Sequence, residues 1–177
     1  MQTHLVLTVI GPDRPGLVNL LSDAIAAGGG NWLDARMASL ADQFAGIVLA
    51  AVDASRADAL VEVLQDLQAQ GLRVTIERSR VQPAPGRTGR RMQLELVGHD
   101  RPGIVRDVSR VLADQRVTIT EFESETASGS FSGESLFKAR ALIELPADLE
   151  LDTLQRGLEA LANELMVDLK LASEPGH

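Results

Sequence analysis

The chain has 177 residues, of which 45% are apolar, and no cysteine, which together exclude a disordered chain, disulfides and thiol catalysis. No apolar run approaches the ~20 residues that span a bilayer, and the N-terminus lacks the basic region of a secretory signal, so we expect a cytoplasmic protein without a membrane partner. The formal net charge of −8 disfavours direct nucleic-acid binding, which needs clustered lysine and arginine.

The first part of the chain alternates strand-like and helix-like segments. Residues 5–10 are apolar on both faces and predict a central strand. Apolar residues at helical spacing predict a helix over 17–25, which three consecutive glycines end. Strands are predicted next over 31–40 and 44–52, followed by a helix over 60–67 and a strand over 72–76. The predicted order of this part is therefore βαββαβ.

The tetrapeptide Asp-Arg-Pro-Gly connects the first strand to the first helix, and it occurs twice. The copies stand at 13–16 and 100–103, each after a glycine and before an aliphatic pair. We predict that Asp13 caps the first helix. A turn of this kind leaves backbone N–H groups free at the positive end of a helix. The two copies predict two equivalent binding corners, and the alternative is that each is only a turn.

The second part of the chain repeats the pattern of the first. The repeat is offset by 87 residues at the motif (Asp13 to Asp100) and by 93 residues at the last strand (Val74 to Val167). The additional residues fall in a Ser/Gly-rich stretch over 127–134, which we predict to be a loop. The predicted strands cover 94–97, 117–126, 136–145 and 167–171, and the predicted helices cover 104–112 and 151–165.

A short basic segment separates the two repeats. Residues 80–91 contain two prolines, two glycines and four arginines but no acidic residue, whereas the chain on either side is acidic. This composition predicts a linker. Its arginines are either a solvated tether or a binding site for an acidic partner. The sequence therefore predicts two domains, 1–79 and 92–177, joined by the linker 80–91.

Two βαββαβ units with a Gly-x-Asp-Arg-Pro-Gly corner resemble a tandem pair of ACT domains, and the resemblance runs from about Thr3 to Leu171. The second unit also resembles the glycine cleavage system transcriptional repressor family, whose members consist of two ACT domains. The segments that carry this resemblance are 117–134, 136–139, 145–147 and 165–168. The resemblance implies an α+β fold of two ferredoxin-like domains in tandem, each a four-stranded antiparallel sheet with two helices on one face.

The resemblance also implies a function. A protein of this family would sense a small amino acid, glycine being one candidate, and would repress glycine cleavage genes through a DNA-binding transcription activator. Such a protein would be a homodimer and would not bind DNA itself. No catalytic motif stands out, so we expect neither enzyme activity nor a cofactor. The alternatives are a ligand-free protein-interaction module and an amino-acid-binding regulator of a metabolic enzyme.

The chemistry of an amino acid suits the corners. Helix N–H groups and an arginine fork would hold the carboxylate, and an aspartate would pair with the ammonium group. The start of the second strand of each unit is included because family members show Asn-Ile there, whereas this chain has Asn only in the first copy. The expected ligand-binding residues are Gly11, Asp13, Arg14, Gly16, Leu17, Asn31, Trp32, Gly98, Asp100, Arg101, Gly103, Ile104, Thr118 and Ile119.

Three further features have more than one interpretation. Trp32, the only tryptophan, either lines a pocket or fills core volume. Alternating glutamates at 121, 123 and 125 share one strand face, where they form either a solvated surface or a cation site. His99, in the second corner, is either a surface histidine or a group that tunes binding with pH. No histidine stands at a metal-ligand spacing, and we expect no metal site.

Overall fold

The computed structural model describes residues 1–79, 89–128 and 135–173. The chain divides into two compact units, Met1–Pro85 and Gly86–His177, which we call domain 1 and domain 2. Most of the predicted linker, 80–88, lies outside the described residues, and its residues Arg90 and Arg91 open a strand. The boundaries 1–79 and 92–177 stay predictions.

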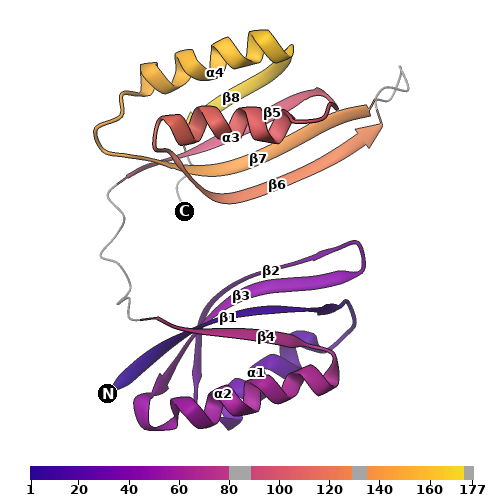
Figure 1. Cartoon of the computed structure of the whole chain (residues 1–177), viewed down its shortest axis with the longest axis vertical. Helices are drawn as coiled ribbons and strands as arrows, with labels where there is room; N and C mark the ends of the chain where they lie inside the picture. Colours follow the sequence, from indigo (N-terminus) through magenta and orange to yellow (C-terminus); the bar gives the residue numbers. More distant parts are fainter. Residues whose placement is uncertain (80–88, 129–134, 174–177) are drawn as a thin grey trace. The chain divides into compact units, whose positions relative to one another are not determined.

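Domain 1 is one antiparallel sheet of four strands with helices on one face (Figure 1). The strand order is β2-β3-β1-β4, so β1 is central, as its apolar faces predict. The elements are β1 (Gln2–Pro12), α1 (Leu17–Ala27), β2 (Asn31–Leu40), β3 (Gln43–Asp53), the 3₁₀ turn η1 (Ala54–Arg56), α2 (Ala57–Asp66), the 3₁₀ turn η2 (Leu67–Gln70) and β4 (Arg73–Ser79).

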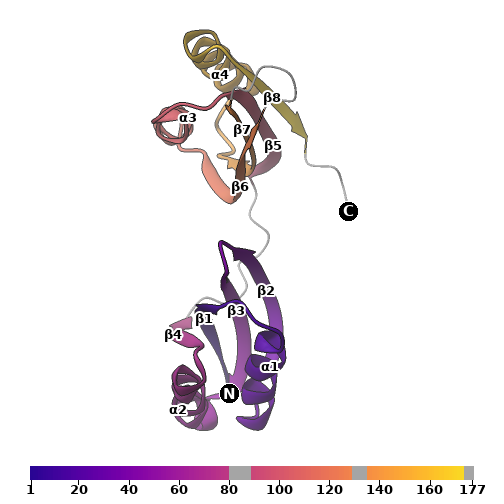
Figure 2. The ribbon, with the colours of Figure 1, turned by 90° about the vertical axis from the view of Figure 1, so that its right-hand side faces the viewer.

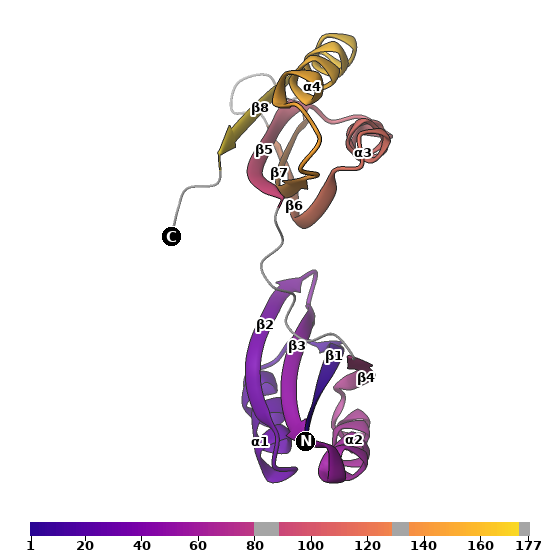
Figure 3. The same ribbon diagram turned by 90° about the vertical axis from the view of Figure 1, so that its left-hand side faces the viewer.

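Domain 2 repeats this topology, with the strand order β6-β7-β5-β8. Figures 2 and 3 show its two helices, seen nearly end-on, on the same side of the sheet. The elements are β5 (Arg90–His99), α3 (Ile104–Asp114), β6 (Thr118–Ser128), β7 (Ser135–Leu145), α4 (Leu151–Leu165) and β8 (Val167–Ser173). The predicted α+β fold of two ferredoxin-like βαββαβ units is thus confirmed.

Each sheet buries one face against its own helices. In β1 the side chains of Leu5, Leu7 and Val9 are fully buried, whereas the alternate residues between them are more exposed. This two-residue period gives a strand one inner and one outer face. The helices bury leucines at helical spacing against the inner face, Leu60 and Leu64 in α2 among them. The result is one hydrophobic core per domain.

The same edge strand is irregular in both domains. In β2 the register shifts between Trp32 and Asp34, and in β6 it shifts between Ile119 and Glu121. Each shift is a β-bulge, which inserts one residue into the ladder and increases the local twist. Neither bulge was predicted from the sequence.

The two central hairpins differ in length. In domain 1, β2 and β3 are joined by Ala41 and Asp42, which have positive φ angles of 49° and 60°. This geometry is that of a type I′ turn. In domain 2, β6 and β7 pair out to Ser128 and Ser135. Of the predicted loop over 127–134, the first two residues belong to β6 and the others lie outside the described residues.

No helix in the described parts of the chain is long and apolar enough to cross a membrane.

Candidate functional site

The first corner joins β1 to α1. Gly16 occupies the N-cap position with a left-handed backbone (φ 90°), which glycine adopts without steric cost. No side chain caps the helix, so the prediction that Asp13 is its N-cap is wrong. The helix hydrogen bonds begin with the donation of Leu20 N–H to the Gly16 carbonyl at 2.8 Å. The first-turn N–H groups therefore lack a side-chain acceptor and are available to an anion.

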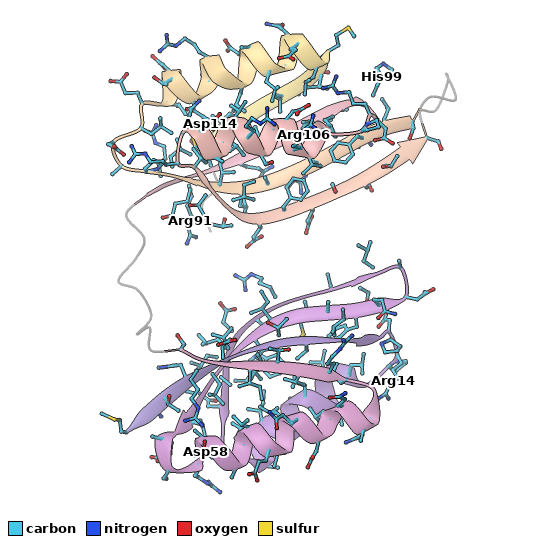
Figure 4. The ribbon with its side chains drawn as sticks, viewed as in Figure 1. Arg14, Asp58, Arg91, His99, Arg106 and Asp114 are labelled. Atoms are coloured by element: carbon cyan, nitrogen blue, oxygen red, sulfur yellow. The ribbon has the colours of Figure 1, made fainter. Side chains whose placement is uncertain are left out.

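Contacts from distant segments hold the two charged residues of the first corner. The Asp13 N–H donates to the carbonyl of Asp42 in the hairpin turn at 2.9 Å, and the Ser39 hydroxyl donates to Asp13 Oδ2 at 2.7 Å. Asp13 thus fixes the corner to the β2–β3 hairpin. On the other side, Arg14 Nη2 donates to the carbonyl of Gln70 at 2.6 Å (Figure 4).

The second corner has the same backbone geometry as the first, but its arginine forms an ion pair. Gly103 is left-handed (φ 89°) at the N-cap of α3, again without a side-chain cap. The Asp100 N–H donates to the Ser135 carbonyl at 2.9 Å, as Asp13 does to its hairpin. Arg101, however, lies 3.3 Å from the Asp107 carboxylate in the first turn of α3. The second corner therefore contains an internal anion beside its arginine.

Asp107 contacts a second arginine at this corner. Arg106 contacts its other oxygen at 2.9 Å. The Arg106 hydrogen bond, together with the charges of Arg106, Arg101 and Arg110, lowers the pKa of Asp107 although partial desolvation opposes this. The position equivalent to Asp107 in α1, 87 residues earlier, is Leu20.

Arg14 and Arg101 therefore differ in whether a carboxylate of the protein balances their charge. Among the described residues, Arg14 contacts a neutral carbonyl and no carboxylate, whereas Arg101 is paired with Asp107. A bound carboxylate would meet an uncompensated cation at the first corner. At the second corner it would compete with Asp107.

The glycines that precede the motif have a packing role. A Cβ at Gly11 would collide with the carbonyl of Gly71, and a Cβ at Gly98 would collide with the side chain of Val167. Both glycines let β1 and β5 pass close to the neighbouring chain, which explains the residue type without a ligand.

The aliphatic residues after the motif are core residues. The side chains of Leu17 and Ile104 are 2% and 3% exposed. They pack in the cores of their domains, so their side chains are not available to a ligand at the helix end.

The residues expected at the start of the second strand lie at the far end of the sheet. Asn31 pairs with Ala51, which pairs with His4, seven residues from Gly11 along β1. At ~3.3 Å per residue this is roughly 23 Å. Trp32 is partly buried and packs against the core. One small ligand within domain 1 cannot touch both the corner and these two residues.

Domain 2 shows the same separation. Ile119 pairs with Ile143, which pairs with Met92, six residues from Gly98 along β5. The distance is about 20 Å at ~3.3 Å per residue. The structure thus brings the residues of each corner together and leaves Asn31, Trp32, Thr118 and Ile119 outside both corners.

Sequence reasoning missed four residues that shape the corners. Ser39, Asp42 and Gln70 contact the first corner from far along the chain, and nothing local in the sequence points to them. Asp107 had a visible signal, because it is an acidic residue in the first turn of a helix.

Two open hollows lie on the surface of domain 2. A hollow of about 430 Å³ lies beside the second corner, next to α4 and β8, and its lining includes Gly98, His99, Asn163, Met166 and Asp168. Glu123 and Glu125 line a second open hollow on the outer face of the sheet. Glu121 shares that face, and within the described residues no three acidic or histidine side chains form a cluster that could hold a metal ion.

Comparisons with known proteins agree with this architecture. The glycine cleavage system transcriptional repressor of Escherichia coli (strain K12) is 24% identical over 166 residues, which are 93% of this chain and 86% of the relative. A solved structure of an unknown protein from Galdieria sulphuraria is 30% identical and superposes with a TM-score of 0.82, covering 99% of this chain and 100% of its own.

A second solved structure has the same fold over a similar length. It is a protein provisionally assigned as a glycine cleavage system transcriptional repressor, with a TM-score of 0.73 at 22% identity, covering 99% of both chains. The model of the ACT domain matches twice, over residues 3–78 and 90–172. These two matches cover both βαββαβ units, and the chain therefore belongs to the ACT domain family.

Proposed function

We propose that this protein senses a small amino acid, glycine being the first candidate, and represses glycine cleavage genes through a protein partner. The observation that carries the proposal is the similarity to the Escherichia coli repressor, which extends over 93% of this chain and thus over both ACT domains. A shared single domain would support only the fold, whereas a match across both domains and their connection supports a shared regulatory role.

The corners supply the chemistry for an amino acid. The uncapped helix start at Gly16 suits the carboxylate, and Arg14 adds a cation without a carboxylate partner among the described residues. The Asp13 carboxylate, whose Oδ2 accepts the Ser39 hydroxyl, suits the ammonium group. We propose the first corner as the tighter site because a ligand carboxylate there meets Arg14 directly, whereas at the second corner it would have to displace Asp107 from Arg101.

The partner in this proposal is a DNA-binding transcription activator in the cytoplasm. The net charge of −8 opposes direct contact with DNA, because phosphates bind clustered lysine and arginine. Repression would then come from a protein–protein contact whose strength the amino acid changes. We also propose that the protein is a homodimer. The sensing and repression steps do not depend on this second copy. Catalysis plays no part in it.

A titration with free amino acids tests the sensing step. We expect glycine or another small amino acid to raise the unfolding temperature of the purified chain, because a ligand that binds only the folded state stabilises it by mass action. Arg14→Ala should weaken this binding about tenfold or more, the range for a hydrogen bond to a charged group. Arg101→Ala should weaken it less.

Calorimetric titration of these variants and of the control Arg56→Ala, an exposed arginine outside the corner, measures the effect. Equal affinity of Arg14→Ala and the control would place the ligand elsewhere. If none of the amino acids binds, the alternative of a ligand-free interaction module replaces the sensor.

Two experiments test the repression step. Deletion of the gene should raise transcription of the glycine cleavage genes, and the purified protein alone should not shift their promoter DNA at physiological salt. A specific, salt-dependent complex with the DNA would overturn the partner-mediated mechanism. Unchanged transcription would favour the other alternative, regulation of a metabolic enzyme.

A further inference from the structure

Domain 2 contains an apolar cavity between α3 and its sheet, which we call the α3 cavity. It has a volume of about 90 Å³ and is lined by α3 on one side and by β5, β6 and β7 on the other. All but one of the lining residues are apolar, and no charged residue is among those that the structure describes there. Water finds few hydrogen-bond partners in such a place. The α3 cavity therefore suits an apolar molecule better than water or an ion.

The matching place in domain 1 is filled by larger side chains. Trp32 packs against the core there, and its counterpart in domain 2, 87 residues later, is Ile119. Val48 is fully buried and has Ala141 as its counterpart, since both pair with the same leucine position of the central strand. The topology therefore does not require a cavity, and shorter side chains in domain 2 leave one.

The lining residues that are larger than their counterparts do not close the cavity. Leu96 and Ala139 each add only one carbon to the residue found in domain 1. Phe122 stands where domain 1 has Ala35, but 43% of its side chain is exposed. Val105, across from it on α3, is 42% exposed. These two residues form an apolar rim through which a ligand can enter from solvent.

The α3 cavity has one polar side chain in its lining, that of Ser109. The Ser109 hydroxyl donates to the carbonyl of Arg106 at 3.0 Å, so its proton is used within α3 and its oxygen is left as an acceptor. Phe122 and Phe137 also line the cavity, and aromatic rings pack favourably against one another in offset or edge-to-face arrangements. This lining favours an aromatic ring that carries one hydrogen-bond donor.

We propose that the α3 cavity binds a small, uncharged aromatic molecule with one hydrogen-bond donor, of which phenol is the simplest example. An apolar cavity of ~150 Å³ takes up benzene, so the smaller α3 cavity encloses about one ring at most. A carboxylate or an ammonium group would be buried there without a partner, which excludes a free amino acid. The inference goes beyond the proposed function and does not depend on ligand binding at either corner.

Calorimetric titration of the full chain with phenol tests the proposal. We expect a single site with a dissociation constant of about 1 mM or lower, the range for a well-packed ligand of this size. Benzoate, which has the same ring with a carboxylate, should bind at least ~10-fold more weakly.

Two variants locate the phenol. Ala141→Val should weaken its binding at least ~10-fold, because the two additional methyl groups occupy the cavity. The buried Val48 of domain 1 shows that the fold accepts valine at this position. Ala172→Val is the matched control, since Ala172 is an exposed residue of β8 outside the lining. Circular dichroism checks that both variants are folded.

A third variant tests the hydrogen bond. Ser109→Ala should weaken the binding of phenol about fivefold, the range for one neutral hydrogen bond, and leave the binding of benzene unchanged. An equal effect on the two ligands would overturn the assignment of Ser109 as the acceptor.

The absence of phenol binding at about ten times the expected dissociation constant would overturn the proposal. Equal affinity of Ala141→Val and Ala172→Val would also overturn it, because the phenol would then bind elsewhere. The readout is phenol binding, so failure here leaves amino-acid sensing and repression, which are measured separately, unaffected.

Discussion

Asp107 is the residue that makes the two corners different. Both corners have the same motif, the same left-handed glycine and the same backbone contact to a hairpin. Where α1 has Leu20, α3 has Asp107, and its carboxylate contacts both Arg101 and Arg106. The arginine of the first corner therefore has no carboxylate partner among the described residues, whereas the arginine of the second corner has one.

The lowered pKa of Asp107 makes its contribution to stability depend on pH. A folded-state pKa below the unfolded value means that the stabilisation is fully present above the ordinary aspartate pKa of about 4 and is lost as the pH falls through the folded value. We expect Asp107→Asn to be less stable than the wild type at pH 7. The difference should shrink below about pH 4. Urea unfolding at pH 7, 4 and 3 measures it, and a difference that is constant over this range would contradict the ion-pair origin.

Prediction from sequence at this scale succeeds for the turns and fails for contacts. A strand-to-helix turn was predicted at both motifs and is present, whereas the left-handed backbone of Gly16 and Gly103 was not predicted. Asp13 does not cap the helix: the N-cap position is Gly16, and the Asp13 carboxylate accepts instead from Ser39, 26 residues away. A contact of that range depends on the register of two strands, which a local pattern does not contain.

Helix α1 explains why the start of β2 lies far from the corner. Its 11 residues return the chain by about 16 Å at 1.5 Å per residue before β2 begins. The predicted order of strand, helix and strand already contained this reversal, so the distance between Gly16 and Asn31 could have been predicted. The bulge at Leu33 was not predicted, although the adjacent apolar residues Trp32 and Leu33 interrupt the alternation of the strand there.

The β2–β3 hairpin contains strain that a substitution can relieve. Ala41 has a φ of 49°, a region that costs a residue with a Cβ roughly 1–2 kcal/mol and that asparagine tolerates. We expect Ala41→Asn to stabilise domain 1 by about 1 kcal/mol. The β-branched Ala41→Val should destabilise it instead. Urea unfolding followed by Trp32 fluorescence measures both, and equal midpoints would show that the turn relaxes without cost.

At the scale of the molecule, the two cores share no residue. Leu64 in α2 and Leu158 in α4 are matched core leucines, 0% and 3% exposed. We expect Leu64→Ala to destabilise domain 1 by about 2–5 kcal/mol and to leave the unfolding of domain 2 unchanged.

Trp32, the only tryptophan, separates the two transitions. Its fluorescence should respond to Leu64→Ala but not to Leu158→Ala, whereas circular dichroism should respond to both. A Trp32 transition that moves with Leu158→Ala would mean that the two domains unfold as one cooperative unit.

The edges of the two sheets have a consequence for aggregation. An exposed edge strand is a template on which another chain can add, and short, bulged or charged edges prevent this. Here β4 and β8 have only seven residues each, β2 and β6 are bulged, and β6 adds glutamates at 121, 123 and 125. All four edges thus resist a fifth strand. We therefore expect a chain that contains two complete sheets to resist growth into fibrils by strand addition.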